Sequence, residues 1–337
     1  MSTKGDHRSD PSPGPEPAPS PCPEPESGPE PGPAPGPTQL PRPSGAQILA
    51  ARDVAAQRLG VTLGAAFPEG STGWVGAATG ARGEDLVLKV AWAHEEARDE
   101  ALGMSIWSSG PDSGREEPRP IVPRVLEARR EGALSVLLME RVRPGTTLAR
   151  SGLPPQREDE VVAGLLRRLW IPADDLPGAP EHGFRPLAHM CAWWADEAAE
   201  RLARDSRGLP EELVRRGLDL FRALPREHGV PEVLLATDLH HHNVLAAGGE
   251  GPDHGGSWLV IDPKPYVGDP HYDLLQHMFN AEDRLVEDPS GFSARMARLT
   301  GLDPERTARW LLARCIQEAP GSAAAARAAL RLAADGI

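Results

Sequence analysis

The most informative stretch of the chain runs from Val233 to Asp273 and reads VLLATDLHHHNVLAAGGEGPDHGGSWLVIDPKPYVGDPHYD. It contains two short apolar runs, Val233–Ala236 and Trp258–Ile261, and an aspartate closely follows each of them, Asp238 and Asp262. A short apolar run of this kind predicts a buried strand. A strand that ends at a carboxylate brings that charge to the rim of a sheet, where a ligand can meet it.

The spacing of the polar residues in this stretch is typical of phosphoryl transfer. Asn243 lies five residues after Asp238, and Asp262 follows the second apolar run. The reaction needs a carboxylate near the attacking hydroxyl, and it needs an oxygen ligand and a second carboxylate to hold magnesium on the phosphates. We therefore assign Asp238 as the catalytic carboxylate and Asn243 and Asp262 as Mg²⁺ ligands. Taken singly, each residue is better explained as a turn or cap residue than as a catalytic one, so the assignment depends on the whole set.

Composition excludes several classes of protein. The chain has 337 residues, 39% of them apolar, and a formal net charge of −13, which argues against a nucleic-acid partner held by phosphate contacts. An acidic surface suits a cationic ligand, although it also simply aids solubility. No apolar run approaches the ~18 residues needed to cross a bilayer. The three cysteines are far apart in sequence and the N-terminus lacks the apolar core of a signal peptide, so we expect a cytoplasmic protein.

Residues 1–44 form a proline-rich tail that we expect to be disordered. Of the 37 prolines in the chain, 15 fall in this segment, where they alternate with glutamate, glycine, serine and alanine. Such a segment cannot bury enough apolar surface to offset its chain entropy. It is either an inert tail or a docking ligand for a partner protein, and no single binding motif marks it.

Residues 45–142 predict a small lobe that binds nucleotide. A helix over Ser44–Leu59 precedes three strand patterns, at 61–67, 73–79 and 85–92, with glycine-rich turns between them. Consecutive strands joined by short turns predict a twisted antiparallel sheet. The turn at 70–73 is either a cover for nucleotide phosphates or an ordinary hairpin turn.

Lys89 is the most informative residue of this lobe. It lies in the middle of the third strand pattern, where a lysine needs a partner. The predicted helix over residues 94–107 places Glu96 and Glu100 one turn apart on one face. A strand lysine paired with a glutamate of the next helix is how kinase folds direct the lysine at phosphate oxygens. We expect Glu100 to be that partner, with Glu96 as the alternative.

Two further strands, Val122–Ala128 and Leu134–Glu140, lead out of this lobe. Their end is the point at which the sheet of a bilobal kinase meets its helical lobe. By position alone, we expect backbone groups near Glu140 and Val142 to bind the edge of an adenine ring.

Residues 143–337 predict a helical lobe that carries the catalytic loop and the metal site. Apolar residues recur at helical spacing in several segments, which are 157–170, 186–204, 210–224, 272–280, 292–299, 304–318 and 322–334. Asp269 and Glu318 are the candidate carboxylates for contact with a cationic substrate. Three consecutive histidines, His240–His242, and His254 suggest a transition-metal site, but adjacent histidines seldom share one ion without ligands from other elements.

At these residues the chain resembles the aminoglycoside phosphotransferase family, in particular the branch with streptomycin phosphotransferases and hydroxyurea-type resistance kinases. The resemblance covers about residues 60–320, and its most specific part is the last of the segments that carry it, which are GWVG (73–76), LKVAW (88–92), HEEARDEALG (94–103), LLRRLWIP (165–172), DLHHHNVLAA (238–247) and WLVIDPKPYVGDPHYDLLQHMFN (258–280).

The resemblance implies an α+β, protein-kinase-like bilobal fold, with a small antiparallel-sheet N-lobe and a mainly helical C-lobe. It implies transfer of phosphate from ATP, with Mg²⁺, to a hydroxyl of a small molecule. Matched by position, Asp238 is the catalytic aspartate, Asn243 and Asp262 are the metal ligands, and Lys89 is the phosphate-binding lysine with Glu100 beside it.

One departure from the family pattern concerns the catalytic loop. The family usually has His-Gly before the catalytic aspartate, whereas this chain has Ala236-Thr237, and His242 stands where glycine is common. A β-branched threonine replaces a residue with a freer backbone. Three hypotheses follow: an antibiotic kinase with streptomycin as the first acceptor to test, a kinase of hydroxyurea or another small metabolite, and a nucleotide-binding pseudokinase with weakened catalysis.

Overall fold

A computed structural model of the chain describes Met1 and residues 41–67, 73–94, 97–109, 120–248 and 257–337. By its internal contacts the chain divides into two units, Met1–Pro35 and Gly36–Ile337, and every helix and strand below belongs to the second. The predicted proline-rich tail lies almost entirely outside the described residues. Residues 70–72 of the turn considered for phosphate binding lie outside them too.

The N-terminal part is a five-stranded antiparallel sheet with two helices. The strand order is β1-β2-β3-β5-β4, and the bounds are β1 Thr62–Ala66, β2 Gly73–Thr79, β3 Asp85–Trp92, β4 Val125–Glu131 and β5 Leu134–Glu140. Helix α1 (Gly45–Leu59) begins at a capping box, in which the Ser44 hydroxyl accepts from the amide of Gln47 and the Gln47 side chain accepts from the amide of Ser44. Helix α2 (Glu100–Ser109) follows β3.

The two faces of the sheet have different neighbours because side chains alternate along a strand. Leu88 and Val90 of β3 are fully buried in a small core with Ala55 and Ala56 of α1. Lys89 points to the opposite face, and its Nζ reaches α2. The alternation of side chains along β3 therefore separates a packing face from the face that carries Lys89.

Several predicted boundaries are wrong by three residues or more, among them the first residues of α2 and β4. Helix α2 begins at Glu100 rather than His94, because Asp99 lies in the turn before it and accepts a hydrogen bond from Arg185 Nε at 2.9 Å. Strand β4 begins at Val125 rather than Val122. Ile121 and Val122 are instead buried in the large core, where the Ile121 carbonyl accepts a hydrogen bond from the amide of Val260 at 2.7 Å.

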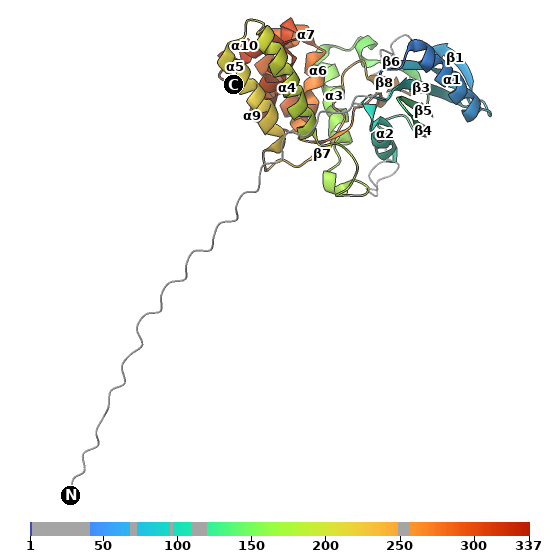
Figure 1. Ribbon diagram of the computed structural model, residues 1–337, viewed down its shortest axis with the longest axis horizontal. Coiled ribbons are helices and arrows are strands. Elements are labelled where there is room, and N and C mark those ends of the chain that lie inside the picture. The colour runs from blue at the N-terminus through green and yellow to red at the C-terminus, as the bar shows by residue number, and fades with distance from the viewer. Residues whose placement is uncertain (2–40, 68–72, 95–96, 110–119, 249–256) are drawn as a thin grey trace. The chain divides into compact units, whose positions relative to one another are not determined.

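The rest of the chain is mainly helical, as predicted. Its α-helices are α3 Pro155–Leu169, α4 Leu187–Arg204, α5 Glu211–Ala223, α6 Leu275–Phe279, α7 Glu282–Glu287, α8 Pro289–Thr300, α9 Pro304–Glu318 and α10 Ala323–Ala334. Its 3₁₀ helices are η2 Leu148–Arg150, η3 Ala173–Asp175, η4 Leu224–Arg226 and η5 Pro270–Leu274. Figure 1 shows α4, α5, α9 and α10 gathered into one bundle. Across the described ranges, no helix combines the length and apolarity that a bilayer crossing requires.

Two small antiparallel sheets position the stretch from Val233 to Asp273. Strand β7 (Val233–Leu235) pairs with β10 (Tyr266–Gly268), and β8 (Val244–Ala247) pairs with β6 (Pro144–Thr147) and β9 (Ser257–Val260). The segment between β7 and β8 contains Asp238 and Asn243, and Asp262 follows β9. Because Ile261 donates its amide to the Asn243 carbonyl at 2.9 Å, the β8–β9 pair holds Asn243 next to Asp262. The predicted α+β architecture is confirmed, whereas the lobe boundary at residues 142 and 143 stays a prediction.

Candidate active site

Lys89 is the meeting point of the two lobes. Its Nζ lies 2.7 and 2.8 Å from the two carboxylate oxygens of Glu100 and 2.7 Å from Oδ1 of Asp262. Lys89 and Glu100 are almost fully buried, at 9% and 2% exposure. Glu100 is thus the partner of Lys89, and the alternative, Glu96, lies outside the described residues. The structure joins a strand of the sheet, helix α2 and the end of β9 at a single ammonium group.

The charges of this cluster stabilise one another. Burial disfavours the ammonium form of Lys89, but the neighbouring Glu100 and Asp262 outweigh this cost and raise the pKa of Lys89 above its ordinary value. Burial also opposes ionisation of Asp262, and the ammonium groups of Lys89 and Lys264 reverse that effect and lower its pKa well below the usual range. Lys89 is therefore charged and Asp262 ionised at neutral pH, which is the state that phosphate and metal binding require.

Asp238 and Asn243 lie on the loop between β7 and β8. Asn243 donates its side-chain amide to the Asp238 carbonyl at 3.0 Å, which leaves the amide oxygen as a possible ligand. Leu239 is fully buried and anchors the loop to the core. The Asp238 side chain is 27% exposed, so its carboxylate remains accessible to a small molecule.

Asp262 and Asn243 fit a Mg²⁺ ion. Both offer oxygen ligands, the Asp262 side chain is 41% exposed, and the β8–β9 pair holds the two residues together. A Mg²⁺ ion in a kinase takes only one or two protein ligands and completes its shell with phosphates and water. Accordingly, a protein cage is not needed, and the described residues include no group of three or more His, Cys, Asp or Glu side chains that could form one.

The departure at Ala236-Thr237 has a structural counterpart. Thr237 has φ of +51°, in the left-handed region that favours glycine, the residue usual in the family. Two contacts hold it there: its amide donates to Oδ1 of Asp273 at 2.6 Å, and its hydroxyl donates to the carbonyl of Lys264. The threonine hydroxyl thereby connects the catalytic loop directly to the segment that follows Asp262.

The Asp273 carboxylate holds the catalytic loop in place through hydrogen bonds. Besides Thr237, it accepts hydrogen bonds from the Ala236 amide and from Nε1 of Trp170, each at 3.0 Å. Burial raises the pKa of Asp273 to about 6, although these three donors favour the ionised form. Asp273 therefore titrates near the lower end of the physiological range.

Lys264 is the site residue that sequence reasoning did not single out. Its Nζ lies 2.7 Å from Oδ1 of Asp262 and 3.6 Å from Oδ2 of Asp238. The available signal was its place within IDPKPYVGDP, two residues after Asp262. Spacing alone did not show that its side chain turns back towards both aspartates.

The residues expected to contact adenine lie at the end of β5 and just beyond it. The Glu140 amide donates to the Arg124 carbonyl at 3.0 Å, and the Glu140 side chain pairs with the Arg124 guanidinium at 2.7 Å. The Glu140 amide is therefore already bonded within the protein. A backbone contact with adenine at Val142, two residues beyond β5, stays a prediction.

The two candidate substrate carboxylates, Asp269 and Glu318, are held in contacts that do not include Asp238. Asp269 is buried, and its oxygens bind the His271 amide at 2.9 Å, Nε of Arg306 at 2.7 Å and Nε1 of Trp310 at 2.6 Å. Both oxygens are occupied, which leaves the predicted substrate contact of Asp269 without a free oxygen. Its role is to fix helix α9 to the segment after β10.

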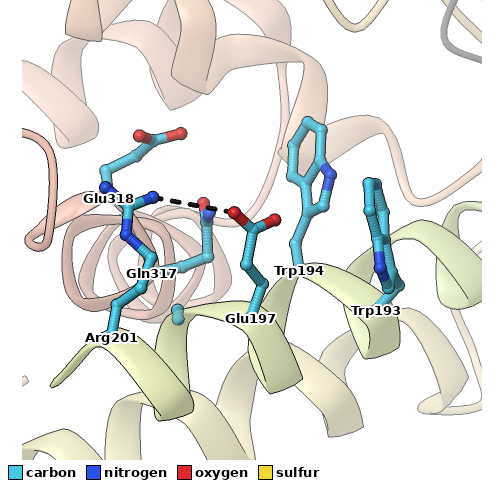
Figure 2. Close-up of a pocket in the computed structure, with 7 residues that line it drawn as sticks. Trp193, Trp194, Glu197, Arg201, Gln317 and Glu318 are labelled. Atoms are coloured by element: carbon cyan, nitrogen blue, oxygen red, sulfur yellow. Dashed lines mark ion pairs between the residues drawn. The ribbon is translucent and has the colours of Figure 1, made fainter. Parts of the chain in front are cut away.

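Glu318 lies in a surface pocket between α4 and α9. Figure 2 shows Trp193, Trp194, Glu197 and Arg201 on α4 and Glu318 on α9 around this pocket. Glu318 is paired with Arg314 at 2.7 Å. None of the residues around Lys89 lines this pocket, so the structure does not bring Glu318 to the phosphate site.

The histidine cluster forms part of the catalytic loop. His240 Nε2 lies 3.8 Å from Oδ1 of Asp238, and burial together with His242 and His241 lowers the pKa of His240 to about 4. The ring is therefore neutral at pH 7. His254, the fourth histidine considered for zinc, lies outside the described residues.

Comparison with known proteins agrees with this geometry. A family model described as aminoglycoside/hydroxyurea antibiotic resistance kinase matches residues 67–328. The hydroxyurea phosphotransferase of Kitasatospora aureofaciens is 32% identical over 265 residues, which are 77% of this chain and 69% of the relative. The streptomycin 6-kinase of Streptomyces griseus is 33% identical over 250 residues, 70% of each chain.

Solved structures show the same fold at lower sequence identity. Choline kinase LicA from Streptococcus pneumoniae superposes with a TM-score of 0.52 and 13% identity, over 86% of this chain and 97% of that chain. A GDP complex of a mutant aminoglycoside 2'-phosphotransferase-IIIa superposes with a TM-score of 0.50 and 15% identity, over 86% and 97%. At these identities the likeness establishes the fold only.

Proposed function

Since the chain belongs to the aminoglycoside/hydroxyurea antibiotic resistance kinase family, we propose that it transfers the terminal phosphoryl group of ATP to a hydroxyl of streptomycin or a similar cationic aminoglycoside. Membership of the family makes the chain a small-molecule phosphotransferase with an alcohol acceptor. The nucleotide, the metal and the identity of the acceptor are our proposals. We also place the reaction in the cytoplasm, where ATP is available.

The observation that carries the proposal is the contact between Lys89 and Asp262. These residues are 173 positions apart in sequence, and their side chains meet at 2.7 Å with Asp238 close by. Glu100 fixes the direction of the Lys89 ammonium group, which would bind oxygens of the nucleotide phosphates. Asp238 would orient the acceptor hydroxyl and take its proton as the new bond to phosphorus forms.

Asp262 and Asn243 would hold Mg²⁺ through their side-chain oxygens. When bound, the ion supplies positive charge that neutralises the phosphate oxygens during transfer. The contribution of this chain is to keep the Asp262 carboxylate ionised and the Asn243 amide turned by its bond to the Asp238 carbonyl.

The negative net charge of the chain and the substrates named for its relatives both favour a cationic acceptor. The net charge of −13 favours approach of a cation over an anion. Two of the curated relatives are streptomycin 6-kinases, from Streptomyces griseus and Streptomyces glaucescens. Hydroxyurea is the second candidate acceptor because one relative of similar identity is a hydroxyurea phosphotransferase.

The test is a screen with purified protein, ATP and Mg²⁺ against streptomycin, kanamycin and hydroxyurea. Mass spectrometry would detect one added phosphate on the acceptor. We expect Asp238→Asn to lower kcat by about 10²–10⁴-fold while ATP still binds. Asp219→Asn is the matched control, because Asp219 is an exposed residue of α5 whose carboxylate pairs with Arg215 of the same helix at 3.4 Å.

Three outcomes would contradict the proposal in different ways. Undiminished turnover in Asp238→Asn would overturn the role of that residue. A product from hydroxyurea but not from streptomycin would make hydroxyurea the acceptor in place of streptomycin. ATP binding with no product from any acceptor would favour the pseudokinase hypothesis.

A further inference from the structure

The active site contains a second ammonium group, which belongs to Lys264. Its Nζ lies 2.7 Å from Oδ1 and 3.1 Å from the carbonyl oxygen of Asp262, and 3.6 Å from Oδ2 of Asp238. It therefore bridges the carboxylate assigned to the metal and the carboxylate assigned to the acceptor. The phosphoryl group has to cross the space between these two groups as it moves from nucleotide to acceptor.

We propose that Lys264 is a second phosphate-binding lysine, whose ammonium group contacts the phosphoryl group while it is transferred. This inference rests on the proposed function and adds a catalytic residue to it. In the transfer, the acceptor oxygen bonds to the terminal phosphorus, the bond from that phosphorus to the bridging oxygen breaks, and its electron pair leaves with ADP. The hydroxyl proton passes to Asp238, and Lys264 keeps its own protons throughout.

Holding the catalytic loop in place does not require the ammonium group of Lys264. The backbone of Lys264 is already held to the catalytic loop, since its amide donates to the Ala236 carbonyl at 2.8 Å and its carbonyl accepts from the Thr237 hydroxyl. The Asp262 carboxylate, for its part, already has an ammonium partner in Lys89. The loop is thus held without the ammonium group, and at Asp262 the ammonium group shares with Lys89 the stabilisation of the ionised carboxylate.

The neighbouring prolines fix where the Lys264 side chain begins. Lys264 stands between Pro263 and Pro265, and both rings restrict the adjacent backbone. Pro265 packs on α2 at Gly103, where an added Cβ would lie only 2.6 Å from the proline Cγ. The base of the side chain is thus fixed against the helix that carries Glu100, and the side chain is only 14% exposed.

The charge balance of the site points to an anionic ligand. Apart from Lys264, the cluster has one ammonium group, on Lys89, against the carboxylates of Glu100, Asp262 and Asp238. Before any metal ion is counted, a phosphoryl group that approaches Asp238 would meet net negative charge from these side chains. A cation at the position of Lys264 offsets this repulsion at the point where the phosphoryl group and Asp238 come closest.

The choice of lysine over arginine supports the same reading. The chain has 36 basic residues, of which 33 are arginines and three are lysines, Lys4, Lys89 and Lys264. Two of the three lysines therefore reach the same oxygen of Asp262. An ammonium group is a compact point charge that fits between two carboxylates and a moving phosphoryl group, whereas a guanidinium is a wide planar fork.

The experiment compares Lys264→Met, Lys264→Arg and Lys4→Met in the full chain. Lys4→Met is the chemically matched control, since it removes the third lysine, which lies outside the described residues. For each variant we would measure kcat and KM, the dissociation constant of ADP with Mg²⁺, the same constant with aluminium fluoride added as a phosphoryl mimic, and the melting temperature.

We expect Lys264→Met to lower kcat by about 10²–10³-fold, the usual loss when one preorganised group is removed from a transition state. ADP affinity should change less than about threefold, and the tightening caused by aluminium fluoride should be largely lost. Lys264→Arg should keep part of the wild-type kcat and part of the tightening by aluminium fluoride. Lys4→Met should match the wild type in both measurements.

The inference is overturned if Lys264→Met keeps kcat within about threefold, or keeps the full aluminium fluoride effect. It is also overturned if the loss of kcat comes with an equally large loss of ADP affinity and with a lower melting temperature, because that pattern belongs to a structural role. If the wild type binds nucleotide but modifies no acceptor, the acceptor proposal fails, and the aluminium fluoride measurement still decides the role of Lys264. A wild type that binds no nucleotide overturns both proposals.

Discussion

Substitution of Thr237 separates two opposing effects of one side chain. The residue has φ of +51°, a conformation that costs a non-glycine residue about 1–2 kcal/mol. Its hydroxyl donates to the partly buried carbonyl of Lys264, a bond with a net contribution of about 1 kcal/mol. The strain and the hydrogen bond are therefore of similar size and opposite sign.

Three variants test this balance. Thr237→Gly relieves the strain, loses the hydroxyl and adds about 0.5–1 kcal/mol of unfolded-state entropy, so its free energy of unfolding should lie within about 1 kcal/mol of the wild type. Thr237→Val keeps the strain and leaves the Lys264 carbonyl without its donor, which should cost about 1–3 kcal/mol. Thr237→Ser keeps the hydroxyl and should stay close to the wild type.

Urea denaturation followed by circular dichroism measures these differences, provided that the m-value is unchanged. Thr237→Val should also lower kcat. The carbonyl that loses its donor belongs to Lys264, whose ammonium group lies between the side chains of Asp262 and Asp238. A valine variant as stable as the wild type would refute the contribution of the hydroxyl bond. A glycine variant more stable than the wild type by over about 2 kcal/mol would show that the hydroxyl does not compensate the strain.

Two further predictions concern buried groups. Asp273 has a folded-state pKa of about 6 against an ordinary value of 3.8, so its contribution to stability is largest below pH 3.8 and is lost as the pH rises through 6. The difference in unfolding free energy between the wild type and Asp273→Asn should therefore shift by about 1–2 kcal/mol in favour of the wild type from pH 7.5 to pH 5, and a constant difference would contradict the assignment. Gly217→Ala should destabilise the protein by about 1–3 kcal/mol, because a Cβ on Gly217 would lie 2.4 Å from Cγ1 of Ile316 where α5 packs on α9. An unchanged melting temperature in Gly217→Ala would show that the two helices can separate at low cost.

The sheet and the catalytic loop were readable from sequence because their signals are local. Alternation in β3 distinguished the face of Leu88 from the face of Lys89, and the structure buries the first against α1 and turns the second to Glu100. Element ends were less predictable. Helix α2 starts six residues later than its pattern suggested, because Asp99 is held in a turn by a contact with Arg185, 86 positions away.

The sequence by itself predicted Lys89, Asp238, Asn243 and Asp262 as one set. Phosphoryl transfer needs these residue types, and each of them lies in a recognisable local pattern. Tertiary structure alone decided which other polar groups join them. Asp269 looks free in the sequence, yet its oxygens are bonded to Arg306 and Trp310 of α9, about 40 positions away. Lys264 looks like one polar residue among prolines, yet its side chain lies between two carboxylates. The physical reason is that a hydrogen bond or ion pair depends on distances between atoms that only the packed chain brings together.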